Sequence, residues 1–284
     1  MHSYKLRTGS MATTLVLVLG LCAYADVPAF ACRPILRVPR TITHPGHYCV
    51  LRNLSTDISS GAAITIAADD VVLDLGDRIL DGSAAGPATE AVGIGAFGRS
   101  NVTVRNGTVR GFLAGLQLTD DGTSHGHVIE DVTAERNTSR GIEAEGAGLR
   151  ISGNHVRLTG GSTSALGARA YGILLRAPES VVLDNEVTGT TGSGSSFVYG
   201  IWATGSNGLT IEGNRVENKA LAAFYSFGIL LPFSFDVLVS NNRITRFSEG
   251  VTYSSNSTGK YRDNLTAGVA RPFNGTGTDA GNNQ

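Results

Sequence analysis

Two acidic residues and one basic residue are the groups in this sequence best suited to chemistry. Glu143 and Glu145 lie in the stretch G-I-E-A-E, and Arg176 ends the matching stretch G-I-L-L-R. Side chains two apart on a strand point to the same side, with Cα atoms about 7 Å apart. A pair of carboxylates near this separation can hydrolyse a glycosidic bond as acid and base, with Arg176 holding a substrate carboxylate. The spacing therefore makes these three residues catalytic candidates.

Two other interpretations of these residues stay open. With Asp120 and Asp121 expected nearby, the carboxylates could hold Ca²⁺ while Arg176 draws a proton from a uronic acid. The plainer interpretation is a solvated face on which Glu145 and Arg176 form an ion pair of small energetic value. The sequence therefore leaves both the Ca²⁺ requirement and catalysis itself undecided.

Trp202 marks a second group, one that could stack against sugar rings. The repeats described below place Leu174 and Leu230 beside this single tryptophan. Aromatic residues are expected on the loops next to it: Tyr171, Tyr199, Phe224 and Tyr225. Exposed apolar patches on soluble proteins are frequently contact sites. The alternative is that these loops fold down and bury Trp202 as a satellite of the core.

Three smaller patterns complete the candidates. His125 and His127 form an H-x-H pair that could bind a metal. No third ligand accompanies the pair at a clear spacing, so a polar surface loop is the favoured interpretation. Glu186, Arg215 and Arg243 are interpreted as a charge ladder on another face.

All these residues lie in a sequence that repeats itself. One phrase alternates apolar residues, breaks at Asn or Gly and closes on an apolar residue: Leu149–Val156, Leu209–Val216 and Val237–Ile244. A second phrase is a glycine followed by an alternating pair, at Gly141, Gly172, Gly200, Gly228 and Gly250. The two phrases alternate with a period of roughly 22 to 31 residues, which indicates a repeat architecture. Period-two alternation indicates strands with one buried face.

Such short strands cannot bury their apolar sides alone, but stacked coils about 4.8 Å apart can. The pattern therefore predicts an all-β fold, a right-handed single-stranded parallel β-helix of about eight coils. Asn154, Asn185, Asn214 and Asn242 fall at the bend of successive coils. Because Asn tolerates left-handed backbone angles and its amide can bond to the next coil, they predict an internal ladder. Gly107 is expected at the same bend of an earlier coil, where it carries no steric penalty.

Long loops precede the second phrase in three consecutive coils: Thr159–Tyr171, Gly189–Tyr199 and Asn218–Phe227. Stacked on one side, they would form a wall beside the flat face that carries Glu143, Glu145 and Trp202. A wall beside a face makes a groove, and functional residues are frequent on such loops.

These phrases, with A-A-D-D-V-V-L-D-L-G-D-R-I-L-D-G at Ala67–Gly82, resemble the right-handed β-helix repeats of the pectate-lyase-like superfamily. The resemblance covers about residues 62 to 266 and implies the fold, with a general link to acidic polysaccharides. It implies no single activity, because relatives include lyases, hydrolases, epimerases, phage tailspikes and copper-maturation proteins. The polygalacturonase R-I-K and the epimerase D-P-H-D motifs are missing. No catalytic residue of those families is therefore carried over.

The N-terminal residues 1–31 predict a secretory signal peptide. The apolar stretch Ala12–Ala23 follows a basic start and is too short to span a bilayer, and small residues lead to a cleavage site after Ala31. Two cysteines remain after cleavage, and in an exported protein Cys32 and Cys49 predict a disulfide. Lipid modification of Cys32 is the alternative.

The remaining segments divide the chain further. Residues 32–61 are expected to form an N-terminal cap that holds the disulfide, and residues 62–266 the β-helix. Residues 267–284 are polar and rich in glycine, which predicts a loose cap or a disordered tail.

Composition bounds the partners. The net charge is -1 and 17% of the residues are charged, so no basic face for nucleic acid is expected. The favoured hypothesis is a secreted or periplasmic monomer, without a transmembrane segment in the mature chain, that binds an acidic polysaccharide along one groove. In its enzymatic version it is a lyase or hydrolase. The alternative is a non-catalytic surface or periplasmic module for binding or structure, and metal handling by the histidines comes third.

Overall fold

The computed structural model describes residues 32–164, 169–193, 196–219, 225–254 and 256–284. The expected signal peptide and its cleavage site after Ala31 lie outside these residues, as does Phe224. Among the described residues, no helix has both the length and the apolar character needed to cross a membrane.

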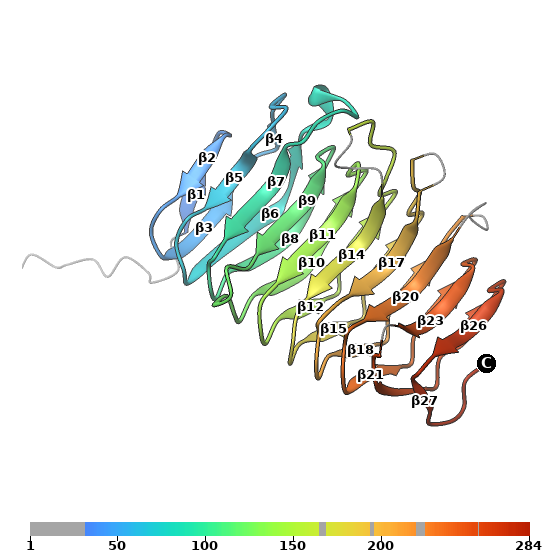
Figure 1. Ribbon diagram of the computed structural model, residues 1–284. Helices are drawn as coiled ribbons and strands as arrows, with labels where there is room; N and C mark the ends of the chain where they lie inside the picture. The colour runs from blue at the N-terminus through green and yellow to red at the C-terminus, as the bar shows by residue number, and fades with distance from the viewer. Residues whose placement is uncertain (1–31, 165–168, 194–195, 220–224, 255) are drawn as a thin grey trace, which may run out of the picture. The chain divides into compact units, whose positions relative to one another are not determined.

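The described chain is a parallel β-solenoid of about nine turns, close to the predicted eight coils. Figure 1 shows successive coils stacked side by side from the blue to the red end of the colour bar. One sheet has ten strands, contributed by successive coils: β2 (Arg40–Ile42), β5 (Ala62–Ile66), β7 (Val92–Phe97), β9 (Ala114–Thr119), β11 (Arg140–Glu145), β14 (Ala170–Arg176), β17 (Val198–Ala203), β20 (Ser226–Pro232), β23 (Glu249–Ser254) and β26 (Arg271–Gly275).

The other sheet has seventeen strands. Its first part consists of β1 (Arg33–Ile35), β3 (Gly46–Val50), β4 (Leu54–Ser55), β6 (Val71–Asp81), β8 (Thr103–Arg110) and β10 (Val128–Glu135). From there on each coil contributes two short strands: β12 (Arg150–Ser152) with β13 (His155–Arg157), β15 (Val181–Leu183) with β16 (Glu186–Thr188), β18 (Thr210–Glu212) with β19 (Arg215–Glu217), β21 (Val237–Ser240) with β22 (Arg243–Thr245), and β24 (Gly259–Arg262) with β25 (Leu265–Ala267). The last strand is β27 (Thr278–Asp279), and one 3₁₀ turn, η1, covers Ser83–Ala85.

The interior is built from columns of equivalent apolar residues. Ile151 pairs in register with Val182, Val182 with Ile211, and Ile211 with Val239. All four are at most 1% exposed. Burying each such side chain contributes about 1.5–3 kcal/mol. The predicted stacking of the repeats in a single interior column is therefore confirmed.

The predicted asparagine ladder occupies the bend of the seventeen-stranded sheet. Asn185 Oδ1 accepts the backbone N–H and the Nδ2–H of Asn154 at 3.0 and 2.9 Å. The same two bonds join Asn185 to Asn214, Asn214 to Asn242, and onward to Asn264 and Asn283. The expected reason for asparagine is wrong in one respect. The left-handed residue is the one before each ladder asparagine, such as Gly153 or Asp184, with φ of 65° and 53°.

Gly107 also stands at the bend for a different reason than expected. Its φ is not positive, so conformational freedom is not required there. A Cβ at this position would lie 2.4 Å from the Leu75 Cβ and 2.8 Å from the Arg78 carbonyl oxygen. Close packing of neighbouring coils, and not backbone strain, therefore requires a glycine.

The N-terminal residues 32–61 carry regular strands instead of a separate cover. β1 pairs with β3, β2 with β5, and β3 and β4 with β6, so the segment continues both sheets. The disulfide between Cys32 and Cys49 is present, with Cα atoms 5.6 Å apart. It fastens the first coil to the second.

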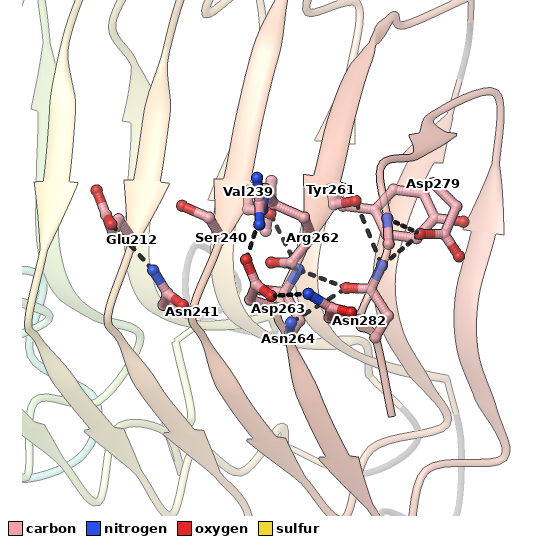
Figure 2. A network of polar contacts seen from close by, with 12 residues as sticks. Glu212, Val239, Ser240, Asn241, Tyr261, Arg262, Asp263, Asn264, Asp279 and Asn282 are labelled. Atoms are coloured by element: carbon pink, nitrogen blue, oxygen red, sulfur yellow. Dashed lines mark hydrogen bonds and ion pairs between the residues drawn. The ribbon is translucent and has the colours of Figure 1, made fainter.

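The C-terminal residues 267–284 likewise form strands, not a loose or disordered tail. β26 and β27 pair with β23 and β24. Figure 2 shows the polar network here, in which Asn282 Nδ2 donates to Asp263 Oδ1 at 3.0 Å and Asn264 Nδ2 donates to the Val239 carbonyl at 2.9 Å. These bonds give polar partners to a coil whose residues are too hydrophilic for an apolar core.

Candidate functional site

The ten-stranded sheet presents an outer face on which the predicted site residues gather in register. One column of this face contains Gln117, Glu143, Leu174, Trp202, Leu230, Thr252 and Asn274. A second contains Arg140, Tyr171, Tyr199, Phe227, Glu249 and Arg271. Glu145 and Arg176 pair beside the first column. The alternation places these side chains outside because Ile142 and Ala144, between them, are fully buried.

Glu143 is already engaged by its neighbours. Its Oε2 accepts a hydrogen bond from Gln117 Nε2 at 2.7 Å and lies 3.3 Å from Arg140 Nη1. The residue is only 8% exposed. A carboxylate held and covered in this way is suited to positioning Gln117 and Arg140, and poorly placed to reach a substrate.

Glu145 is less buried than Glu143 and pairs with Arg176. Glu145 Oε1 lies 3.4 Å from Arg176 Nη1, and its Oε2 accepts the backbone N–H of Asp120 at 3.1 Å. The Arg176 side chain is 64% exposed. The ion pair expected between Glu145 and Arg176 is therefore formed, and it leaves the guanidinium directed to solvent.

The loop carrying Asp120 lies next to this pair. Burial alone would raise the pKa of Asp120, but backbone N–H groups of Ser124, Gly122 and Thr123 donate to its carboxylate and lower the pKa below the ordinary value. Asp120 is thus an ionised residue that shapes its own loop. Together with Arg176, the loop lines a hollow whose other residues include Ser124, His125 and Pro178.

The histidine pair is divided between surface and interior. His125 is exposed, and its Nδ1 lies 3.1 Å from Ser100 Oγ. His127 is 1% exposed, and its Nδ1 accepts the backbone N–H of Val102 at 3.2 Å. Burial is the main cause that lowers the pKa of His127 to about 4, with the charge of His125 acting in the same direction. His127 is therefore a neutral interior residue, which corrects its assignment to a polar surface loop.

Metal binding finds little support in this arrangement. Across the described ranges, no group of three or more His, Cys, Asp or Glu side chains is placed to hold a metal ion. Glu143 and Glu145 also use their oxygens on Gln117, Arg140 and Arg176. These residues therefore do not fit a Ca²⁺ site as they stand.

The aromatic residues form a cluster on the outer face. The rings of Tyr171 and Tyr199 stack with centroids 4.9 Å apart, and Trp202 lies 5.3 and 5.7 Å from them. Leu174, Leu230 and Phe227 pack against this cluster. Tyr171 and Tyr199 belong to β14 and β17 and are buried, which corrects their placement on the flanking loops. Tyr171, Tyr199 and Leu230 thus form a small buried cluster, whereas Trp202 itself is only partly buried.

Two rings extend the cluster into solvent. Phe197 stacks on Tyr225 with centroids 5.6 Å apart and on Tyr199 at 6.2 Å. Tyr225 is 62% exposed. The expected wall of loops is described only in part, because residues 165–168, 194–195 and 220–224 lie outside the described residues. Within the rest, Phe197 and Tyr225 are two accessible aromatic rings beside the face, and Phe97 of β7 is a third exposed ring on the same sheet.

The far end of the face carries a second Glu–Arg pair that the sequence did not reveal. Glu249 Oε1 lies 3.0 Å from Arg271 Nη1, and its Oε2 accepts bonds from Thr252 and Asn274 at 2.8 and 3.0 Å. Glu249 is buried, whereas the Arg271 side chain is 67% exposed. A signal was present, because Glu249 directly precedes Gly250, as Arg140 precedes Gly141.

Comparison with known proteins bears on the fold. A family model described as a right-handed β-helix region matches residues 163–270. The crystal structure of the Dettilon tailspike protein is similar with a TM-score of 0.61 and 15% identity, over 87% of this chain and 50% of that chain. The A-module of mannuronan C-5 epimerase AlgE4 from Azotobacter vinelandii is similar with a TM-score of 0.43 and 15% identity, over 88% of this chain and 91% of that chain. No curated protein matches the sequence.

The fold defines the class of protein as a parallel β-solenoid. More particularly, the chain is a right-handed parallel β-helix protein, as its repeats predicted. It spans half the length of the tailspike chain, and at 15% identity the likeness extends to the fold alone.

Proposed function

We propose that this protein binds an acidic polysaccharide along the outer face of the ten-stranded sheet. One observation carries the proposal. The glutamates of this face are covered and hydrogen-bonded, whereas the side chains of Arg176 and Arg271 are 64% and 67% exposed. A guanidinium pairs with a carboxylate through two parallel N–H···O bonds. The face therefore offers positive charge outward, and its own carboxylates fix the direction of each arginine.

The spacing of the two arginines favours a polymer over a single sugar. Arg176 ends β14 and Arg271 begins β26, which follows β17, β20 and β23 in the sheet. With strands about 4.8 Å apart, four steps separate these positions by about 19 Å in the stacking direction, and the offset between the two ends of the strands adds about 17 Å across it. An extended chain of uronic acids can contact both arginines at once. The exposed rings of Phe197 and Tyr225 lie beside this path, where they can stack on sugars.

A location outside the cytoplasm goes with this proposal. The disulfide between Cys32 and Cys49 supports it, because disulfides persist in oxidising compartments. The export signal expected in residues 1–31 would deliver the chain there. The polymer would then be an extracellular or cell-envelope polysaccharide.

Cleavage of the bound polymer is a second candidate, favoured by the hollow beside Arg176. Asp120, Ser124 and His125 line this hollow together with the arginine. Here Glu145 and Arg176 would act at the substrate, and the covered Glu143 would position Gln117 and Arg140. Binding without cleavage requires no catalytic group in this hollow, so only the cleavage candidate depends on the residues there.

The binding proposal is tested by titrating the protein with polygalacturonate, alginate and neutral dextran. We expect binding to the two acidic polymers and not to dextran, and weaker binding at high salt, since exposed charges are screened. The double variant Arg176→Gln/Arg271→Gln should weaken binding about tenfold or more, because each bond to a charged group is worth about 1.5–3 kcal/mol. Arg150→Gln is the matched control, an exposed arginine of the other sheet.

Equal binding to dextran, or an unchanged affinity of the double variant, would contradict the proposal. Cleavage is measured separately on the same polymers by the appearance of unsaturated or reducing ends. Products that disappear in Glu145→Gln support the second candidate. Binding without products leaves the module non-catalytic.

A further inference from the structure

A basic hollow on the seventeen-stranded sheet has no role in the proposed binding face. Arg215 and Glu217 of β19, Arg243 and Thr245 of β22, and the following Arg246 line it, with Ala267 and Gly268 completing the rim. Three guanidinium groups face one carboxylate within this hollow. Its net charge is therefore positive in a protein whose overall net charge is -1.

Glu217 organises two of the arginines. Its carboxylate pairs with Arg215 Nη2, and its Oε1 lies 2.6 Å from Arg246 Nη1. Burial alone would raise the pKa of Glu217, but the bond from Arg246 and the charge of Arg215 lower the pKa below the ordinary value. Arg246 also donates to the Asn218 carbonyl at 3.1 Å. The two arginines are thus held on the two oxygens of one carboxylate.

Arg243 is the member of the cluster that has no carboxylate partner. Arg215 and Arg243 stand in register on the adjacent strands β19 and β22. Arg215 is compensated by Glu186, with Nη1 2.7 Å from Oε1, as well as by Glu217. Within the described residues, no ion pair or side-chain hydrogen bond involves Arg243, and its side chain is exposed. Like charges directly opposite on neighbouring strands destabilise a sheet, so an anion placed between them would relieve the repulsion.

We propose that this hollow binds an oxyanion, a carboxylate or a sulfate, with Arg243 as the principal ligand and Arg246 and Arg215 at its sides. Arginine forks match the paired oxygens of such groups, and the two flanking forks are already fixed by Glu217. Thr245 also lines the hollow. The site lies on a different sheet from the proposed polymer face and does not rest on it.

The test is calorimetric titration with sodium sulfate and with sodium glucuronate, in chloride buffer held at constant ionic strength. We expect saturable binding of at least one of the two anions. Arg243→Gln should weaken it about tenfold or more, since a bond to a charged group is lost. Arg150→Gln, an exposed arginine of the same sheet without an ion pair among the described residues, is the matched control and should bind as the parent does.

Binding of sulfate alone assigns the hollow to sulfate groups, and binding of glucuronate alone assigns it to uronates. Absence of saturable binding, or equal weakening by Arg243→Gln and Arg150→Gln, overturns the proposal. Arg243→Lys keeps the charge without the fork and should bind at an intermediate affinity, which separates recognition from unfolding. Arg176→Gln/Arg271→Gln should leave this binding unchanged, so failure of the polymer proposal and failure of this one are distinguishable.

Discussion

The asparagine ladder at the inner bend and the aromatic cluster on the outer face both place similar side chains on successive coils. In the ladder each asparagine from Asn154 to Asn242 accepts and donates, so its amide is fully used by the coils on either side. In the aromatic cluster the Trp202 Nε1 is buried and has no hydrogen-bond partner among the described residues. The ladder amides are all hydrogen-bonded, whereas the aromatic cluster keeps a buried donor without a partner in the described part of the chain.

The difference teaches how to separate structural repetition from a surface that is free to bind. A buried polar atom without a partner costs about 1–3 kcal/mol, so a column that serves only stability is expected to have all its buried polar atoms hydrogen-bonded. The outer face keeps exposed rings and guanidinium groups at its edges, at Tyr225, Arg176 and Arg271. Repetition inside the solenoid therefore holds the coils together, and repetition outside it supplies a platform.

The largest expected effect comes from interrupting the ladder with Asn214→Ala. The change removes the acceptor for Asn185 and the donor to the Val182 carbonyl and leaves these buried groups unpaired. We expect the free energy of unfolding to fall by about 4 kcal/mol, since each unsatisfied group costs about 1–3 kcal/mol. Urea denaturation measures this loss.

Asn207→Ala is the matched control in the same coil. Asn207 is exposed, and its side chain accepts a single bond, from the Phe235 backbone N–H at 3.0 Å. It should cost less than about 1 kcal/mol. Similar losses of unfolding free energy in Asn214→Ala and Asn207→Ala would show that the ladder hydrogen bonds stabilise the protein no more than a surface bond does. The contrast between the ladder and the outer face would then not hold.

The second-largest effect concerns His127, an interior residue whose side chain is not fully hydrogen-bonded, unlike the asparagines of the ladder. His127 is buried like a ladder residue, yet its Nε2 has no partner among the described residues. Its pKa of about 4 when folded lies below the ordinary 6.5. Between these pH values the unfolded chain binds the proton and the folded chain does not, so stability falls as pH drops from 6.5 to about 4.

The expected size of this loss is about 3 kcal/mol for His127 alone, at 1.36 kcal/mol per pKa unit. Charged neighbours that bear on His127 are His125, Asp120 and Asp69. Because other groups also titrate, the measurement is the difference between wild type and His127→Gln in urea denaturation across this pH range. A constant difference between the two proteins would mean that the imidazole is not the buried titrating group.

The smallest effect is expected in the aromatic cluster. Tyr199→Ala removes a ring that stacks on Tyr171, Trp202 and Phe227 at the edge of the molecule. We expect a loss of about 2 kcal/mol, less than for a ring in a central core, because the cluster lies outside the main core. Thermal denaturation gives the loss, and Tyr199→Phe, which keeps the ring, should stay close to wild type. If Tyr199→Ala destabilised as much as Asn214→Ala, the cluster would be a structural column like the ladder.

Much of this architecture follows from local features of the chain. Alternation along a strand decides which side chains face inward, and the period decides which of them stack. This is why the phrases that contain Ile151 and Ile211 were expected to stack on each other, and Asn214 to join one ladder. The same alternation and period placed a second set of residues side by side on the outside, in the order seen in the strand register: Glu143, Leu174, Trp202 and Leu230.

Other features could not be predicted because they depend on which neighbour a side chain meets. Asp120 reaches Glu145 from another coil, and Arg140 and Gln117 cover Glu143. The register also brings Arg271 to Glu249 across 22 positions of sequence. Catalytic roles for Glu143, Glu145 and Arg176 and a monomeric state stay predictions.

The sequence by itself determined the coils, their stacking and the identity of the inner and outer columns, because these depend on periodicity along one chain. Only the tertiary structure decided which charges are compensated, which rings are covered and which arginines remain exposed. Those outcomes depend on distances between coils, where a few ångströms separate an ion pair from a free guanidinium. The repeat determines the fold, whereas the binding surfaces arise where the repeated positions carry different residues.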